Sequence, residues 1–223
     1  MSAGLIPRRA FLLAAALLGV PPGCSVLPAP PVAQIYRLSP QPEDPPSRAI
    51  PHSKLTIDLP VASQSLDTDR IALAQGRTRF DYYANSVWTD RLPVLLQTLL
   101  VEAFEADGRI AEVSRDIYGL ADGNLLRTEI RRFEAQYAGP ATGPPEVVVV
   151  LGLRLSTGPE GRLVGHRLVS ARVQASRDKL DAIVTAFDAA IGEALAQSVT
   201  WTVRAISTNR HLTPGRSVRR ATP

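Results

Sequence analysis

The chain has a single cysteine, Cys24, and only three histidines among its 223 residues. One cysteine cannot form an internal disulfide, and His52, His166 and His211 are too far apart in the sequence to form a recognisable metal-binding pair. The sequence also lacks a Walker A loop, a G-x-S-x-G nucleophile elbow and a G-x-G-x-x-G dinucleotide motif. We therefore expect no catalytic residue, no metal and no cofactor.

Acidic residues are missing from both ends of the chain. The last twenty residues contain five arginines and no carboxylate, and residues 24–203 carry 18 basic and 21 acidic side chains. The formal net charge of +4 therefore does not indicate a nucleic-acid-binding protein. We expect residues 204–223 to form a basic, disordered tail, with contact to anionic lipid headgroups as the alternative.

An apolar run of eleven residues, Ala10–Val20, follows Arg8 and Arg9. It is too short for a transmembrane helix, which needs about 20 residues, but it suits the hydrophobic region of an export signal. Cys24 follows a small residue at the point where such a signal is cut. We therefore predict a signal peptide over 1–23 and a lipid anchor on Cys24, which would tether the protein to a membrane.

Two features of this start leave alternatives open. Pro21 stands where the bacterial lipobox usually has leucine, so plain cleavage that leaves a free thiol is the alternative to lipidation. The paired arginines fit either a twin-arginine or a general export signal.

Residues 24–53 are rich in proline, which predicts a semi-rigid linker between the anchor and the body, with a short strand near 34–38. The body of the protein is expected over 54–203. Alternating apolar residues predict strands there, and a shift of parity between Ile130 and Phe133 indicates a β-bulge. The predicted strands are 54–59, 70–73, 77–83, 110–117, 125–137, 147–155 and 163–173.

Two segments have apolar residues at helical spacing. The first runs from about Leu92 to Ala106, with Asp90 as the expected N-cap and Asp107-Gly108 at its end. The second is expected to be capped by Ser176. The order of elements predicts an α+β fold, in which two amphipathic helices pack on one face of a largely antiparallel sheet.

Four of the chain's twelve aromatic residues lie within nine positions: Phe80, Tyr82, Tyr83 and Trp88. They could form a partner-docking surface, or they could fasten a strand to the first helix, and we favour the structural role. His166 alternates with its neighbours in a predicted strand and is expected to be an exposed strand residue.

Several local features together resemble the ABC-type transport auxiliary lipoprotein family of the PqiC type, over residues 34 to 200. They are the lipoprotein-like start, Tyr36-Arg37-Leu38, Arg70-Ile71, Tyr82-Tyr83-x-x-x-x-Trp88 and Leu92-Pro93. The resemblance implies a non-enzymatic periplasmic subunit of an MCE-type lipid transport system. It implies an MCE-domain protein and its ABC transporter as partners, no catalytic residues, and Cys24 as the one transferred functional position. Ser25, where aspartate would signal inner-membrane retention, favours the outer membrane with the protein facing the periplasm.

Two other functions remain as alternatives. A lipid-binding carrier or assembly chaperone would hold phospholipid in a pocket between the helices and the sheet, lined by groups such as Leu96, Leu100, Phe187 and Ile191. An envelope hydrolase with a dispersed site is the other. Nucleic acid is not expected as a partner, and the sequence leaves a homo-oligomer open.

Overall fold

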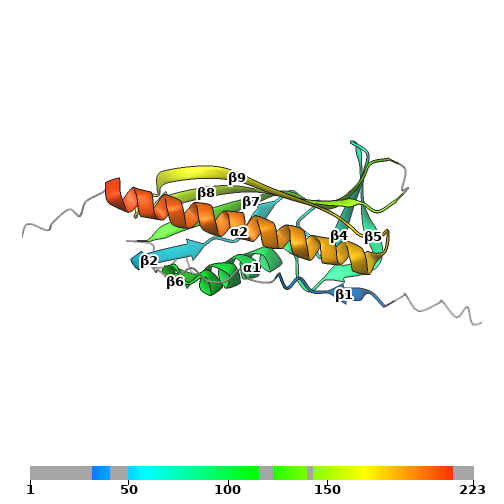
Figure 1. Cartoon of the computed structure of the whole chain (residues 1–223), viewed down its shortest axis with the longest axis horizontal. Helices are drawn as coiled ribbons and strands as arrows, with labels where there is room; N and C mark the ends of the chain where they lie inside the picture. The colour runs from blue at the N-terminus through cyan, green and yellow to red at the C-terminus, as the bar shows by residue number, and fades with distance from the viewer. Residues whose placement is uncertain (1–31, 41–49, 116–122, 140–142, 213–223) are drawn as a thin grey trace, which may run out of the picture. The chain divides into compact units, whose positions relative to one another are not determined.

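The computed structural model describes residues 32–40, 50–115, 123–139 and 143–212. They form two helices and a nine-stranded sheet (Figure 1). The elements in chain order are β1 (Gln34–Tyr36), β2 (Ile50–Ile57), β3 (Val61–Ala62), β4 (Arg70–Gln75), β5 (Arg79–Trp88), α1 (Leu92–Asp107), β6 (Ile110–Ser114), β7 (Asn124–Tyr137), β8 (Glu146–Thr157), β9 (Arg162–Gln174) and α2 (Leu180–Leu212).

Strand β7 organises the sheet. One edge of it pairs antiparallel with β8 from Asn124 to Gln136, and β8 pairs antiparallel with β9. The other edge pairs in turn with β2, β3 and β4, all parallel to it. Three short stretches, 55–57, 61–62 and 73–75, thus lie one after another along this edge of β7. The α+β fold with a largely antiparallel sheet is confirmed, and the short parallel pairings along this edge are an addition to it.

The predicted β-bulge is confirmed. The register between β7 and β8 shifts between Ile130 and Arg132, which leaves Arg131 as the extra residue. Ile130 and Phe133 are three residues apart, a spacing that would place them on opposite faces of a regular strand. The bulge allows both to face the core, where they are 2% and 1% exposed. The shift in the alternation of apolar and polar residues was therefore a sufficient signal to predict the bulge.

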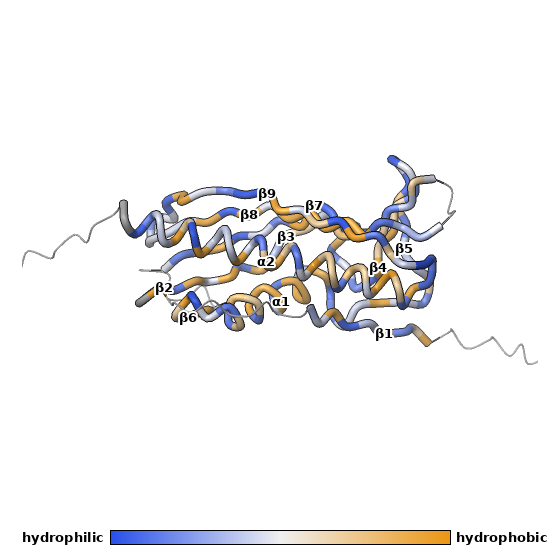
Figure 2. Tube along the Cα trace, viewed as in Figure 1, coloured by the Kyte–Doolittle hydropathy of each residue, from blue (hydrophilic) through white to orange (hydrophobic). Residues whose placement is uncertain are grey.

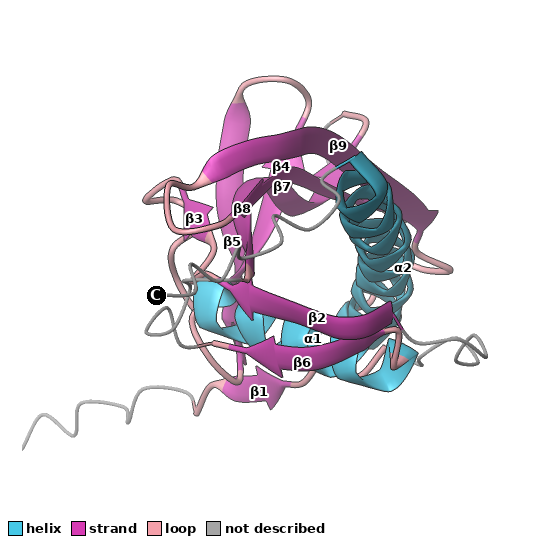
Figure 3. Ribbon diagram, turned by 90° about the vertical axis from the view of Figure 1, so that its left-hand side faces the viewer, coloured by secondary structure: helices cyan, strands magenta, loops and turns pink. Residues whose placement is uncertain are grey.

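The two helices contact each other, and α2 also packs on β7, β8 and β9. In Figure 3, the sheet curves from β9 at the top to β2 and β6 at the bottom, and α2 lies between β9 and α1. The interior between these elements is filled by one hydrophobic cluster that draws on both helices and on most of the strands. Figure 2 shows α1 as a mostly hydrophobic helix, in agreement with its buried leucines.

Three aromatic rings lie at the centre of this cluster. The Trp88 ring meets Phe187 edge-on at a centroid distance of 5.2 Å, and Phe133 stacks on Phe187 at 5.1 Å. All three are at most 2% exposed. They come from β5, β7 and α2, so a single packing unit joins both parts of the sheet to the long helix.

Neither predicted helix cap is correct. Helix α1 begins at Leu92 after Arg91, without a side-chain cap, because the Leu92 N–H donates instead to the Thr68 carbonyl at 3.0 Å. Helix α2 begins at Leu180, four residues after Ser176. In its first turn, the Asp181 carboxylate accepts a hydrogen bond from the Ala182 N–H at 2.8 Å. The end of α1 at Gly108, with φ of 68°, is as predicted.

The structure changes two boundaries expected from composition. Strand β2 begins at Ile50, before the expected end of the linker at residue 53, and α2 continues to Leu212, so that residues 204–212 are helical rather than tail. Residues 1–31, with the expected signal and anchor, and 213–223 lie outside the described residues.

Part of the proline-rich segment is packed on the body. Strand β1 pairs with β5, and Leu38 is 3% exposed. The Ser39 N–H donates to the Asp188 carboxylate at 2.6 Å, and Pro40 lies over Gly192 of α2, where an added Cβ would come within 3.4 Å of the proline ring. Residues 34–40 are therefore bound to the domain and do not act as a spacer.

One buried hydroxyl predicts a stabilising substitution. Thr202 on α2 is fully buried, and its hydroxyl has no hydrogen-bond partner among the residues that the structure describes. Because an unsatisfied buried polar group costs about 1–3 kcal/mol, Thr202→Val should stabilise the protein by about 1 kcal/mol. Urea unfolding measures the change. Ser198→Ala is the matched control, since its hydroxyl donates to the Ala194 carbonyl at 2.6 Å, and it should not stabilise. A loss of stability in the Thr202 variant would contradict the prediction.

Candidate functional site

The histidines and carboxylates are dispersed. Within the described ranges, no group of three or more His, Cys, Asp or Glu side chains could hold a metal ion. His166 is exposed on β9, as expected. The Cys24 thiol lies outside the described residues, as do the side chains of His52 and His211.

The aromatic cluster in β5 divides into separate structural contacts. Trp88 is in the core, while the Tyr82 hydroxyl donates to the Ser65 carbonyl at 2.8 Å and Arg70 lies 3.8 Å over the Tyr82 ring. The Tyr83 hydroxyl lies 2.9 Å from that of Tyr137. These contacts fasten β5 to its neighbours, which supports the structural interpretation of the cluster.

The two tyrosine hydroxyls form a chain that ends on a carboxylate. Tyr137 donates to Asp178 at 2.7 Å, just before α2 begins. Burial, and then the hydrogen bond with Tyr137, raise the pKa of Tyr83, and burial raises that of Tyr137. Both hydroxyls therefore stay protonated at neutral pH and serve as hydrogen-bond donors that join β5, β7 and the start of α2.

The side chains expected to line a lipid pocket are core residues. Leu96, Leu100, Phe187 and Ile191 are each at most 1% exposed and belong to the single hydrophobic cluster. The prediction of a pocket at these residues is wrong, because α2 packs against both α1 and the curved sheet and fills the space between them. Helix α2 is long and apolar enough to cross a membrane by length and composition alone, but 61% of its most apolar stretch is buried inside the domain.

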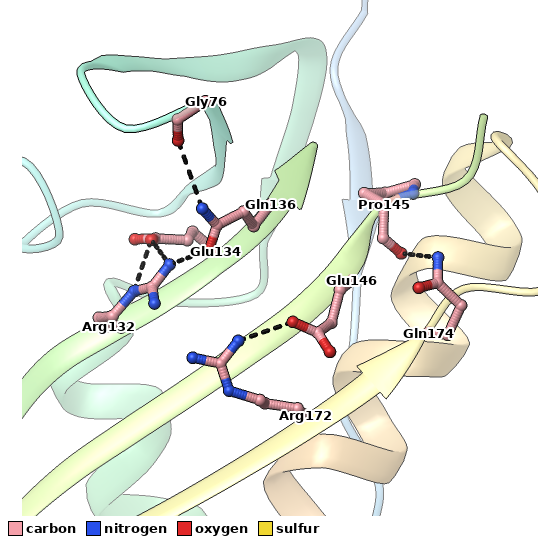
Figure 4. Close-up of polar contacts among 8 residues, drawn as sticks. All are labelled: Gly76, Arg132, Glu134, Gln136, Pro145, Glu146, Arg172 and Gln174. Carbon is pink, nitrogen blue, oxygen red and sulfur yellow. Dashed lines mark hydrogen bonds and ion pairs between the residues drawn. The ribbon is translucent and has the colours of Figure 1, made fainter. Parts of the chain in front are cut away.

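The face of β7, β8 and β9 that points away from the helices carries many charges. At the end near the β4–β5 turn these are paired, as Figure 4 shows. Arg132 donates to Glu134 at 2.7 Å and also to Gln136, and Arg172 on β9 pairs with Glu146 on β8 at 2.7 Å. This end of the face is a balanced, internally satisfied polar surface.

The other end of the same face is different. Arg127, Arg154 and His166 lie directly opposite one another on β7, β8 and β9. The Arg127 side chain pairs with Asp58 at 3.2 Å, but the Arg154 side chain makes no ion pair or hydrogen bond with any residue that the structure describes. Like charges directly opposite each other destabilise a sheet, and of the opposed Arg127 and Arg154 only Arg127 has a carboxylate partner among the described residues.

Arg127, Arg154 and His166 line one shallow cavity of about 570 Å³, and exposed apolar side chains line the same cavity. Leu59, Val61 and Leu168 are 50%, 64% and 53% exposed. Gly152 provides the hollow between them, since an added Cβ would meet the Arg131 Nε at 3.1 Å. We define the Arg154 surface as these six residues: Leu59, Val61, Arg127, Arg154, His166 and Leu168. Sequence reasoning missed it, because the row exists only once the register of three strands is known.

A second hollow lies on the helix side of β9. Trp201 of α2 lies against Gly165, where an added Cβ would be 3.6 Å from the indole ring. Arg167 and Arg204 also line this hollow. The half-buried indole belongs to the packing of α2 on β9 and closes this end of the core.

Comparison with known protein families gives one match that covers most of the chain. The profile described as "ABC-type transport auxiliary lipoprotein component" matches residues 36–200. A curated protein of Bradyrhizobium diazoefficiens, named only as uncharacterized, is 31% identical over 155 residues, which are 69% of this chain. The match covers 40% of that relative, so this chain spans less than half of its length.

Solved structures share the fold. The crystal structure of a Xanthomonas campestris protein assigned to family DUF330 superposes with a TM-score of 0.73 at 25% identity, over 80% of this chain and 99% of that one. Another, described only as an uncharacterized protein, gives a TM-score of 0.60 at 18% identity, over 79% and 99% of the two chains. The second likeness supports the fold alone.

Proposed function

The chain belongs to the family of ABC-type transport auxiliary lipoprotein components, and from this we propose that it is a non-enzymatic lipoprotein subunit of an MCE-type intermembrane lipid transport system. Its role would be to dock the MCE component at the outer membrane, facing the periplasm. The observation that carries the proposal is the family match over residues 36–200, joined to a tightly packed body.

The geometry of the N-terminal segment supports a role as a fixed docking module. Because residues 34–40 are bound to the domain, only residues 25–33 would connect it to a lipid on Cys24. Nine extended residues span at most about 30 Å. The domain would therefore be held near the membrane surface at its β1 side, instead of reaching freely into the periplasm.

Affinity purification tests this function. The full chain, with a C-terminal tag, is expressed in its own bacterium and purified from a detergent extract, with another tagged outer-membrane lipoprotein as the control. We expect an MCE-domain protein and its ABC transporter to be enriched at least tenfold over the control. Repeated recovery of neither would reject the proposal.

Native mass spectrometry separates docking from lipid carriage. Leu96, Leu100, Phe187 and Ile191 are buried core residues, so the described part of the chain has no pocket at these positions, and the purified body is expected to be free of bound phospholipid. Stoichiometric co-purification of a phospholipid would instead favour the carrier.

A further inference from the structure

Within the proposed docking role, on which this inference rests, we infer that the Arg154 surface is the contact site for an acidic segment of a partner protein, one that presents a carboxylate beside an apolar side chain. The carboxylate would pair with Arg154, and the apolar side chain would lie on Leu168 and Val61.

The charge pattern argues for an anionic partner. On this face of β7–β9, four arginines have a carboxylate partner: Arg127 with Asp58, Arg131 with Glu129, Arg132 with Glu134, and Arg172 with Glu146. Among the described residues that line the cavity, Arg154 and Arg167 have none, and of these two Arg154 lies in the opposed row, between Arg127 and His166. An external carboxylate would offset the repulsion between Arg154 and Arg127, and a charge-assisted hydrogen bond to arginine is among the stronger polar contacts.

The apolar neighbours turn this charge into a docking site. Leu59, Val61 and Leu168 are at least half exposed and line the same cavity as Arg154. Arginine surrounded by apolar surface is typical of the residues that dominate binding energy at protein interfaces, because neighbouring contacts exclude water from the ion pair. Such a surface fits a segment that supplies both a negative charge and an apolar group.

The same surface is a poor match for a lipid bilayer. Electrostatic binding to anionic membranes uses clusters of about 4–8 basic residues. Here the carboxylates of Asp58 and Glu129 share the cavity and already pair with two of its four arginines, which leaves two for an external anion. Figure 1 also places the turn between β8 and β9 at the opposite end of the domain from β1, where the tether would begin. Arg154 lies three residues before the end of β8 that leads into this turn. A protein that approaches from the periplasm fits this position.

Binding of the tagged protein to the purified periplasmic part of the MCE-domain protein tests the inference. Arg154→Glu should weaken binding at least tenfold, and Leu168→Ser several-fold, because each removes one half of the contact. Arg77→Glu is the matched control: it makes the same charge change at an exposed arginine in the β4–β5 turn, and it should change binding less than twofold. Circular dichroism checks that each variant is folded.

The outcomes separate the inference from the proposed function. If the wild type binds and Arg154→Glu binds equally well, the inference is overturned and the docking role stands. If the wild type does not bind the MCE-domain protein, the docking role fails, and a second probe decides the inference. This probe is a synthetic peptide of alternating glutamate and leucine, with alternating lysine and leucine as its control.

In an NMR titration of the wild type, the acidic peptide should shift the Arg154 Nε–H signal and the Leu168 methyl signals, and the basic peptide should not. Absence of any shift with the acidic peptide would overturn the inference. Binding to phosphatidylglycerol vesicles that is lost in Arg154→Glu would also overturn it, because the ligand would then be a membrane.

Discussion

Replacing Cys24 with serine is expected to move the exported protein from the membrane fraction to the soluble periplasmic fraction. The reason is the strength of lipid anchoring: each buried methylene contributes about 0.8 kcal/mol, and two or more acyl chains hold a protein stably on a bilayer. Serine keeps the size of the side chain but cannot form the thioether. We expect at least a tenfold fall in the membrane-bound share, measured by fractionation and immunoblotting.

Intact mass of the membrane-extracted wild type provides the direct check, because lipidation adds a characteristic mass to the new N-terminus at Cys24. Pro21→Leu is the informative companion variant. It restores the residue usual in a lipobox, and it should raise the processed share if Pro21 slows recognition. An unmodified Cys24 thiol on membrane-extracted protein would contradict the anchoring hypothesis, whatever the fractionation shows.

The features of the fold that were predicted correctly depend on short stretches of sequence. The bulge in β7 was visible because a change of parity between Ile130 and Phe133 is a local signal, and Gly108 marked the end of α1 because few other residues adopt a positive φ. The helix starts were missed for the opposite reason. The N–H of Leu92 is satisfied by the carbonyl of Thr68, which lies 24 residues earlier and in no local pattern.

Sequence patterns also indicated which faces are apolar without indicating what covers them. The stripe that contains Phe187 and Ile191 was compatible with a lipid pocket or with a packed core, and the curvature of the sheet decides for the core. The Arg154 surface also could not be predicted from the sequence. Its three opposed side chains lie in different strands, and a shift of one residue in register would have moved each to the other face.

The second large effect is expected from Phe187, the residue on which the aromatic core converges. Its ring contacts both Trp88 and Phe133 and has no exposed surface. Phe187→Ala should destabilise the protein by about 3–5 kcal/mol, because it removes a buried aromatic ring and leaves a cavity among β5, β7 and α2. Phe187→Leu, which retains much of the volume, should cost clearly less.

Urea unfolding followed by tryptophan fluorescence measures this effect, since Trp88 lies against the ring that is removed. Phe80→Ala is the matched control: Phe80 is 39% exposed at the start of β5, and its truncation should cost about 1 kcal/mol or less. If the Phe187 variant were no less stable than the Phe80 variant, the aromatic cluster would not be the packing unit that holds α2 on the sheet. The Arg154 surface would then lack the rigid sheet that holds its row of side chains in place.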